Sequence, residues 1–232
     1  MRAGGSTGRS RLAPIPQPAR REPRSLPVRR GPLPLAGPPE IVGGVAKWEG
    51  VRVEGTPPEV AATGSAAFFD CDLDGLSLAG ERIELRLVDC TARALDFANA
   101  ELPGLELTCS SLRDSRMVGA ALGGVLRDVV VSDCVLDLVS LRMCKLSRCE
   151  FRECSLSEAG LYAAELESVL FDGCDLTAAD ISGATFALCE LRRCEMQGVR
   201  GIEALRGARI PLADLLPITP LLADALGIIA TD

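Results

Sequence analysis

Residues 143–156 read MCKLSRCEFRECSL and place a cysteine at every fifth position, at Cys144, Cys149 and Cys154. Each of these cysteines is followed two residues later by a large apolar residue. The spacing continues in both directions, and steps of five from Leu126 meet only apolar residues: Leu126, Val131, Leu136, Leu141, Leu146, Phe151, Leu156, Leu161, Leu166, Phe171, Leu176, Ile181, Phe186, Leu191 and Met196. A small residue stands two places before each of them.

A period of five residues fits neither regular element. On an α-helix, five residues correspond to about 140° of rotation, so these side chains would point in all directions around the axis. On a straight strand, an odd step alternates between the two faces. The side chains can point inward together only if the chain turns a corner every five residues. A short period kept over many copies is typical of a β-solenoid.

Two further registers precede the regular one, from Phe68 to Ile83 and from Leu87 to Leu122. Each register is joined to the next by a step of four residues instead of five, at 83–87 and at 122–126. We interpret each short step as a tightened corner of the same solenoid.

The pattern resembles the pentapeptide repeat proteins over about residues 66–198, most plainly in CDLTAADISGATFAL at 174–188. The resemblance implies a right-handed quadrilateral β-helix with four pentapeptides per coil. We therefore expect an all-β solenoid with a short C-terminal helical cap. The expected segments are a disordered Pro/Arg-rich tail at 1–40, an N-terminal cap at 41–65, the β-helix at 66–198, and a C-terminal helical cap or dimerisation segment at 199–232.

Nine of the ten cysteines occupy the small inner position, and Cys109 lies at a corner. With twenty residues per coil, Cys134, Cys154, Cys174 and Cys194 stack about 4.8 Å apart. Parallel stacking does not give the geometry of a disulfide, and the five-residue spacing does not match a zinc site. We interpret the cysteines as small hydrophobic residues and expect no metal or other cofactor. A thiol redox sensor is an alternative that requires accessible thiolates of low pKa.

The charge is divided unevenly along the chain. Residues 1–40 contain nine prolines and eight arginines against Glu22 and Glu40, a net charge of +6, whereas residues 41–232 hold 17 basic and 30 acidic residues, a net charge of −13. The tail either stays solvated or serves as a basic arm for nucleic acid. No secretory signal or apolar run of about 18 residues is found, so we expect a cytoplasmic protein without a membrane span.

The sequence does not favour an enzyme. It has no histidine, and its only lysines are Lys47 and Lys145, so neither a Cys–His pair nor a P-loop lysine can be built. Outward carboxylates of a solenoid lack the burial that shifts a pKa for acid–base work. We expect a non-enzymatic rod that binds a protein partner.

Acidity is concentrated on two neighbouring sides of the downstream coil, and one of them carries no basic residue. The predicted partner-binding residues are Asp133, Asp137, Glu153, Glu158, Asp172, Asp175 and Glu195. A weaker resemblance to the gyrase-protecting quinolone-resistance group implies an acidic rod that mimics DNA. Its partner would be a type II topoisomerase such as DNA gyrase, or another DNA-handling protein, and the acidic body itself would not bind nucleic acid.

Both ends of a solenoid need caps. Trp48 is expected to cover the first coil, and Pro211 to open a helical turn. Thr219 is the predicted N-cap of a last helix that ends at Gly227, and Pro217 prevents one continuous helix. The residues predicted to cap the rod or to pair two copies are Leu212, Leu215, Leu216, Leu222, Leu226 and Ile228. In the alternative function, a general scaffold binds through this apolar end or through the basic tail, and the acidity serves only solubility.

Overall fold

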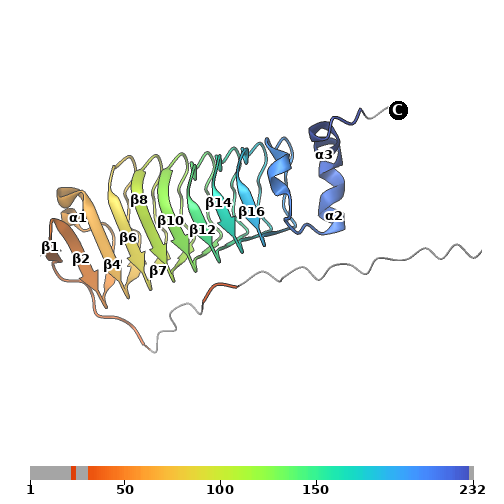
Figure 1. Ribbon diagram of the computed structural model, residues 1–232. Coiled ribbons are helices and arrows are strands. Elements are labelled where there is room, and N and C mark those ends of the chain that lie inside the picture. The colour runs from red at the N-terminus through yellow and green to blue at the C-terminus, as the bar shows by residue number, and fades with distance from the viewer. Residues whose placement is uncertain (1–21, 25–30, 230–232) are drawn as a thin grey trace, which may run out of the picture.

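The computed structural model describes residues 22–24 and 31–229, and shows a rod in which parallel strands stack coil upon coil (Figure 1). One sheet has nine strands: β1 (Glu40–Val42), β2 (Val45–Glu49), β4 (Ser65–Phe69), β6 (Glu84–Val88), β8 (Glu101–Thr108), β10 (Ala121–Arg127), β12 (Lys145–Ser147), β14 (Glu165–Glu167) and β16 (Thr185–Ala187). The other has eight: β3 (Arg52–Glu54), β5 (Asp72–Asp74), β7 (Thr91–Arg93), β9 (Ser111–Arg113), β11 (Val130–Ser132), β13 (Glu150–Arg152), β15 (Leu170–Asp172) and β17 (Glu190–Arg192). The helices are α1 (Pro58–Thr63), η1 (Ile202–Leu205), α2 (Leu212–Leu215), η2 (Leu216–Ile218) and α3 (Thr219–Ala225).

Four sides close each downstream coil, as the five-residue period predicts. The two sheets form two sides, and Val131, Phe151 and Phe171 pair in register at intervals of twenty residues. Ladders of single parallel bridges form the other two sides, one through Val135 and Ser155 and the other through residues 140 and 160. The predicted quadrilateral β-solenoid is therefore confirmed.

The core is the column of residues that the period identifies. All fifteen apolar residues from Leu126 to Met196 are at most 5% exposed. Successive coils place like side chains on top of each other, and the rings of Phe151 and Phe171 stack with their centroids 5.1 Å apart. Burying a large apolar side chain contributes about 2 kcal/mol, so this column is the main stabilising feature of the rod.

The interpretation of the two short steps as tightened corners is wrong, because the corner is absent. The chain runs from the buried Ile83 straight into β6, which buries Leu85 and Leu87, and β10 likewise passes through 122–126 without a turn. A strand returns to the same face every two residues, so a step of four keeps both ends inward without a corner. The neighbouring strand β8 accommodates its extra residue as a bulge at Gly104.

The rod begins earlier than expected. β2 and β3 pair in parallel with β4 and β5, so the segment expected as a separate cap at 41–65 already contains the first coil. Trp48 covers the next coil as predicted, because its ring stacks on Phe68 with centroids 4.9 Å apart. The Trp48 Nε1–H donates a hydrogen bond to the Gly37 carbonyl at 3.2 Å.

Three short helices follow the last coil. η2, which contains Pro217, separates α2 from α3, so the predicted interruption is confirmed. Thr219 is not the N-cap of α3 but its first residue, and its hydroxyl donates to the Leu215 carbonyl at 3.3 Å. Gly227, at a φ of 69°, ends the helix as predicted.

The predicted disordered tail at 1–40 lies largely outside the described residues, as do residues 230–232. Within its described part, Leu35 forms a parallel bridge with Arg52, so the chain is already attached to the eight-strand sheet before β1 begins. None of the described helices combines the length and the apolar character that a membrane span requires.

Candidate interaction surface

Four carboxylates from four consecutive coils lie on the side that follows the eight-strand sheet. These residues, Asp137, Glu158, Asp175 and Glu195, are here called the acidic face. None of them forms an ion pair within residues 22–24 and 31–229. The face is therefore a strip of negative charge that the described part of the rod does not neutralise.

Backbone donors hold two of these carboxylates in place. Asp137 Oδ1 accepts the Ser157 N–H at 3.2 Å and also the hydroxyl of Ser155. Asp175 Oδ1 accepts the Thr177 N–H at 2.8 Å. Because N–H donors carry no net charge, they fix the orientation of the carboxylates and leave the charge available to a partner.

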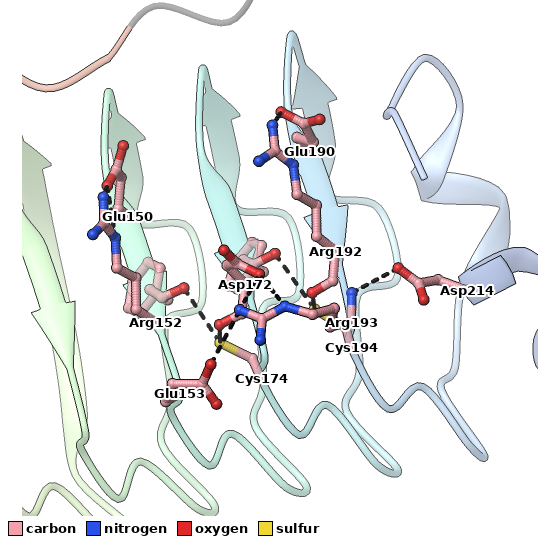
Figure 2. A network of polar contacts seen from close by, with 12 residues as sticks. Glu150, Arg152, Glu153, Asp172, Cys174, Glu190, Arg192, Arg193, Cys194 and Asp214 are labelled. Carbon is pink, nitrogen blue, oxygen red and sulfur yellow. Dashed lines mark hydrogen bonds and ion pairs between the residues drawn. The ribbon is translucent and has the colours of Figure 1, made fainter. Parts of the chain in front are cut away.

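Two other predicted partner-binding residues are engaged within the rod (Figure 2). Arg193 Nη2 lies 2.8 Å from Asp172 Oδ1 and 3.1 Å from Glu153 Oε1. The hydrogen bond with Asp172 raises the pKa of Arg193, with the Coulombic attraction of both carboxylates adding to it. The backbone N–H of Arg193 also donates to Asp214 Oδ2 at 2.6 Å, so this network ties α2 to the last coil. Glu153 and Asp172 thus join coils together, and the single positive charge of Arg193 neutralises one of their two negative charges.

The outer surface of the downstream eight-strand sheet carries paired charges. Arg152 donates to Glu150 within β13, and Arg192 donates to Glu190 within β17 at 2.9 Å (Figure 2). The acidity expected on this side is therefore partly balanced, because Arg152, Arg192 and Arg193 neutralise three of its five carboxylates. Asp133, at the corner between this sheet and the acidic face, is exposed and has no ion pair among the described residues.

Sequence reasoning missed one carboxylate of this corner. A step of twenty residues back from Asp133 leads to Arg113. In the structure, however, the corner position one coil before Asp133 is occupied by Asp114. Asp114 is exposed and has a φ of 50°. The straight passage through 122–126 removes one residue from that coil and shifts the numbering. Counting nineteen instead of twenty across the short step would have found Asp114.

Apolar side chains interrupt the acidic face and extend beyond it. Val135 and Leu138 are 42% and 54% exposed, and Leu138 lies one coil before Glu158 in the same corner column. On the next side, the guanidinium of Arg142 lies 4.9 Å from the ring centroid of the exposed Tyr162. A mixture of carboxylates, aliphatic groups and one aromatic ring is a composition suited to contact with another protein.

Residues 126–200 match a family model described as a pentapeptide repeat region. This range coincides with the unbroken five-residue register and with the most regular coils. The chain contains a pentapeptide repeat region. A comparison with curated proteins finds no match to the sequence.

Several solved structures resemble this chain at low identity. A trypsin-treated form of QnrB1, a plasmid-mediated fluoroquinolone resistance protein, shares 16% identity, with 81% of this chain and 99% of that chain covered and a TM-score of 0.32. Full-length QnrB1 shares 19% identity, with 78% and 90% covered and a TM-score of 0.29. HetL from Nostoc sp. strain PCC 7120, involved in heterocyst differentiation regulation, shares 17% identity, with 70% and 86% covered and a TM-score of 0.23. At these values the likeness carries no information on function.

The cysteines of this chain are free thiols, and all except Cys109 and Cys194 are buried. Nine of the ten occupy the small inner position as predicted, and Cys109 lies at a corner with a φ of 48°. Burial raises the pKa of Cys149 to about 12. Hydrogen bonds with Cys134 and Cys174 raise the pKa of Cys154, and burial raises it further. Hydrogen bonds with Cys154 and Cys194 instead lower the pKa of Cys174 to about 4, but this thiol is buried. The eight buried thiols lack the access that the redox-sensor alternative requires.

The C-terminal end divides the six predicted apolar residues into two groups. Leu215 and Leu222 pack against the core and cap the rod. Leu212, Leu216, Leu226 and Ile228 are exposed, and Leu212 is 73% exposed. The end therefore closes the solenoid and at the same time presents apolar surface outward.

Proposed function

We propose that this protein is a non-enzymatic interaction rod whose acidic face binds a basic surface of a protein partner. The supporting observation is that four consecutive coils each place a carboxylate on one side, without an ion pair inside the described chain. The coils of a solenoid stack about 4.8 Å apart and hold these charges on a preformed surface, so little backbone order has to be gained on binding. We place this function in the cytoplasm, where ten free thiols stay reduced.

The DNA-binding groove of a type II topoisomerase such as DNA gyrase is the candidate partner, as the sequence resemblance implies. Duplex DNA carries about one negative charge per 1.7 Å, or roughly 8 charges over the ~14 Å that four coils span. The acidic face with Asp133 supplies five, counted from the residues named above. The rod therefore offers a reduced version of the DNA charge, supplemented by apolar contacts from Val135 and Leu138.

Neutralising the acidic face tests this function. The variant D137N/E158Q/D175N/E195Q keeps side-chain oxygens that accept the Ser157 and Thr177 N–H groups. At about 0.5 kcal/mol for each charge pair, it should weaken binding to gyrase by about 2 kcal/mol, or roughly 30-fold. Fluorescence anisotropy would measure the affinity, and a supercoiling assay with and without a quinolone would measure the effect on the enzyme.

A matched variant separates the face from the net charge. E84Q/E106Q/E165Q/E167Q also removes four negative charges, but from the nine-strand sheet. There, Glu106 pairs with Arg86 and Glu165 pairs with Lys145. This control should bind within about twofold of the wild type. Equal weakening by both variants would contradict a specific face, and no binding by the wild-type chain at micromolar concentration would remove gyrase as the partner.

A second candidate function, a scaffold that pairs or binds through its C-terminal end, is favoured by the exposed apolar residues there. We expect the wild-type chain to dimerise at high micromolar concentration and Leu212→Glu/Leu216→Glu to weaken the dimer at least about tenfold, because two buried charges would face each other. Sedimentation equilibrium measures both. Leu138→Glu, a change of another exposed leucine on the acidic face, is the control, and a monomeric wild type would reject dimerisation. Binding through the basic tail stays an alternative for the scaffold.

A further inference from the structure

The segment Glu22–Arg24 contacts the rod far from the point where the chain joins the first coil (Figure 1). The Arg52 N–H donates to the Pro34 carbonyl at 2.7 Å, which attaches the chain beside β3. The Arg24 N–H donates to Asp128 Oδ1 at 3.0 Å, between β10 and β11. β11 is four strands from β3 in the eight-strand sheet, or ~19 Å. Ten residues in polyproline conformation reach about 31 Å, so the chain length allows both contacts.

Asp128 is the anchor of this contact. Its side chain is 1% exposed and accepts two hydrogen bonds from Arg148, at 2.6 and 2.7 Å. These hydrogen bonds hold the pKa of Asp128 below its ordinary value. Arg24 adds its N–H and places its Nε 3.9 Å from Asp128 Oδ2. A buried carboxylate therefore receives a backbone donor from a residue 104 positions away.

A groove of about 450 Å³ runs over β11–β17 beside this anchor. Glu22, Pro23 and Arg24 form part of its wall, together with Val130, Glu150, Arg152, Leu170, Asp172 and Arg192. Earlier outward residues of the same ladder are exposed or half-buried: Arg52 is exposed, and Asp72, Thr91 and Ser111 are half-buried. Glu150 and Leu170 are only 4% exposed although they also face outward. The surface is thus covered in the region that the N-terminal segment shares.

We propose that this groove is a docking site for an extended peptide rich in proline and arginine, and that its resident occupant is the chain's own segment at Glu22–Arg24. Pro23 has no N–H that would need a partner, and its ring suits the aliphatic groups of Val130 and Leu170. The alternating charges of Glu150, Arg152, Asp172 and Arg192 suit a segment with alternating Glu and Arg. The occupant shields this part of the eight-strand sheet, and any competing ligand has to displace it. The acidic face is not involved.

A labelled peptide added to full-length protein tests the docking. The probe is fluorescein-IPQPARREPRSLPVRR, which copies residues 15–30. In the wild-type chain, the chain's own segment at Glu22–Arg24 competes with the probe for the groove at an effective concentration of about 1 mM. The variant P23G/R24E weakens the binding of this segment and so reduces the competition. We expect the probe to bind the P23G/R24E chain at least about tenfold more tightly than the wild type, as measured by fluorescence anisotropy.

Two further variants locate the binding. Adding Leu170→Arg to P23G/R24E should remove probe binding, because a long charged side chain then fills the groove, whereas adding Leu138→Arg on the acidic face should leave it unchanged. Thermal unfolding followed by circular dichroism shows that each variant is folded. The proposal is overturned by equal probe affinity for the wild type and P23G/R24E, by no binding to either, or by binding that Leu170→Arg does not affect.

Discussion

Gly124→Ala is expected to destabilise the rod by about 3 kcal/mol, the range of strongly overpacked or strained positions. Gly124 lies in β10 at a φ of 152°, and an added Cβ would stand 2.1 Å from the Leu105 carbonyl oxygen. That oxygen belongs to the backbone of β8, so it cannot move without disturbing the pairing of β8 with β10. Urea unfolding followed by circular dichroism gives the free energy.

Gly123→Ala is the matched control. Gly123 is the preceding residue of the same strand, but the nearest atom to its added Cβ is Pro103 Cα at 3.9 Å, an ordinary contact. We expect a change within about 0.5 kcal/mol. If both substitutions destabilised the protein equally, the bulge at Gly104 and the register of β8 against β10 would be wrong.

Cys149 is expected to react with maleimide about a thousand times more slowly in the folded protein than in urea. Its pKa is raised from 9.0 to about 12 by burial. At pH 8 the reactive thiolate then falls from about 10⁻¹ to about 10⁻⁴ of the molecules. Mass spectrometry of timed labelling reactions would follow each thiol separately, with the partly exposed Cys109 as the internal reference.

The same shift gives a pH dependence of stability. The folded state favours the neutral Cys149 thiol, so its contribution to the free energy of unfolding is fully present below pH 9 and is lost as the pH rises toward 12.

Labelling of Cys149 as fast as that of Cys109 at pH 8 would contradict the buried column and restore the redox-sensor alternative.

The five-residue period predicts the core because it depends only on geometry. Each step from Leu126 to Met196 must point inward, and each of these residues does. The prediction of a tightened corner at the short steps was wrong because a chain can keep both Leu122 and Leu126 inward in two ways. It can make a tighter corner, or it can run straight without a corner. The sequence alone does not distinguish the two, because Gly124 fits a turn as well as a strand.

The candidate site could be predicted only in part. Sorting carboxylates by side correctly placed Asp137 and Asp175 on one strip, since their positions follow from the period. The same sorting could not predict that Arg193 reaches Glu153, because a long side chain can cross two coils and pair with a residue 40 positions away. Local charge patterns do not contain contacts of that kind.

The contact of Arg24 with Asp128 could not be predicted from the sequence either. Composition favours a solvated tail for a Pro/Arg-rich stretch, and a single backbone hydrogen bond to a buried carboxylate leaves no periodic pattern in the sequence. Asp128 itself has the appearance of an ordinary corner residue, because many corners of this rod carry Asp at positive φ.

The salt dependence of gyrase binding tests the acidic face most directly. The affinity of the full-length wild type, D137N/E158Q/D175N/E195Q and E84Q/E106Q/E165Q/E167Q would be measured by anisotropy between about 50 and 200 mM salt, where screening of exposed charges changes strongly. We expect a steep loss of affinity with salt for the wild type and the nine-strand-sheet variant, and a nearly flat response for the acidic-face variant. Equal slopes for all three proteins would contradict the acidic face as the binding surface.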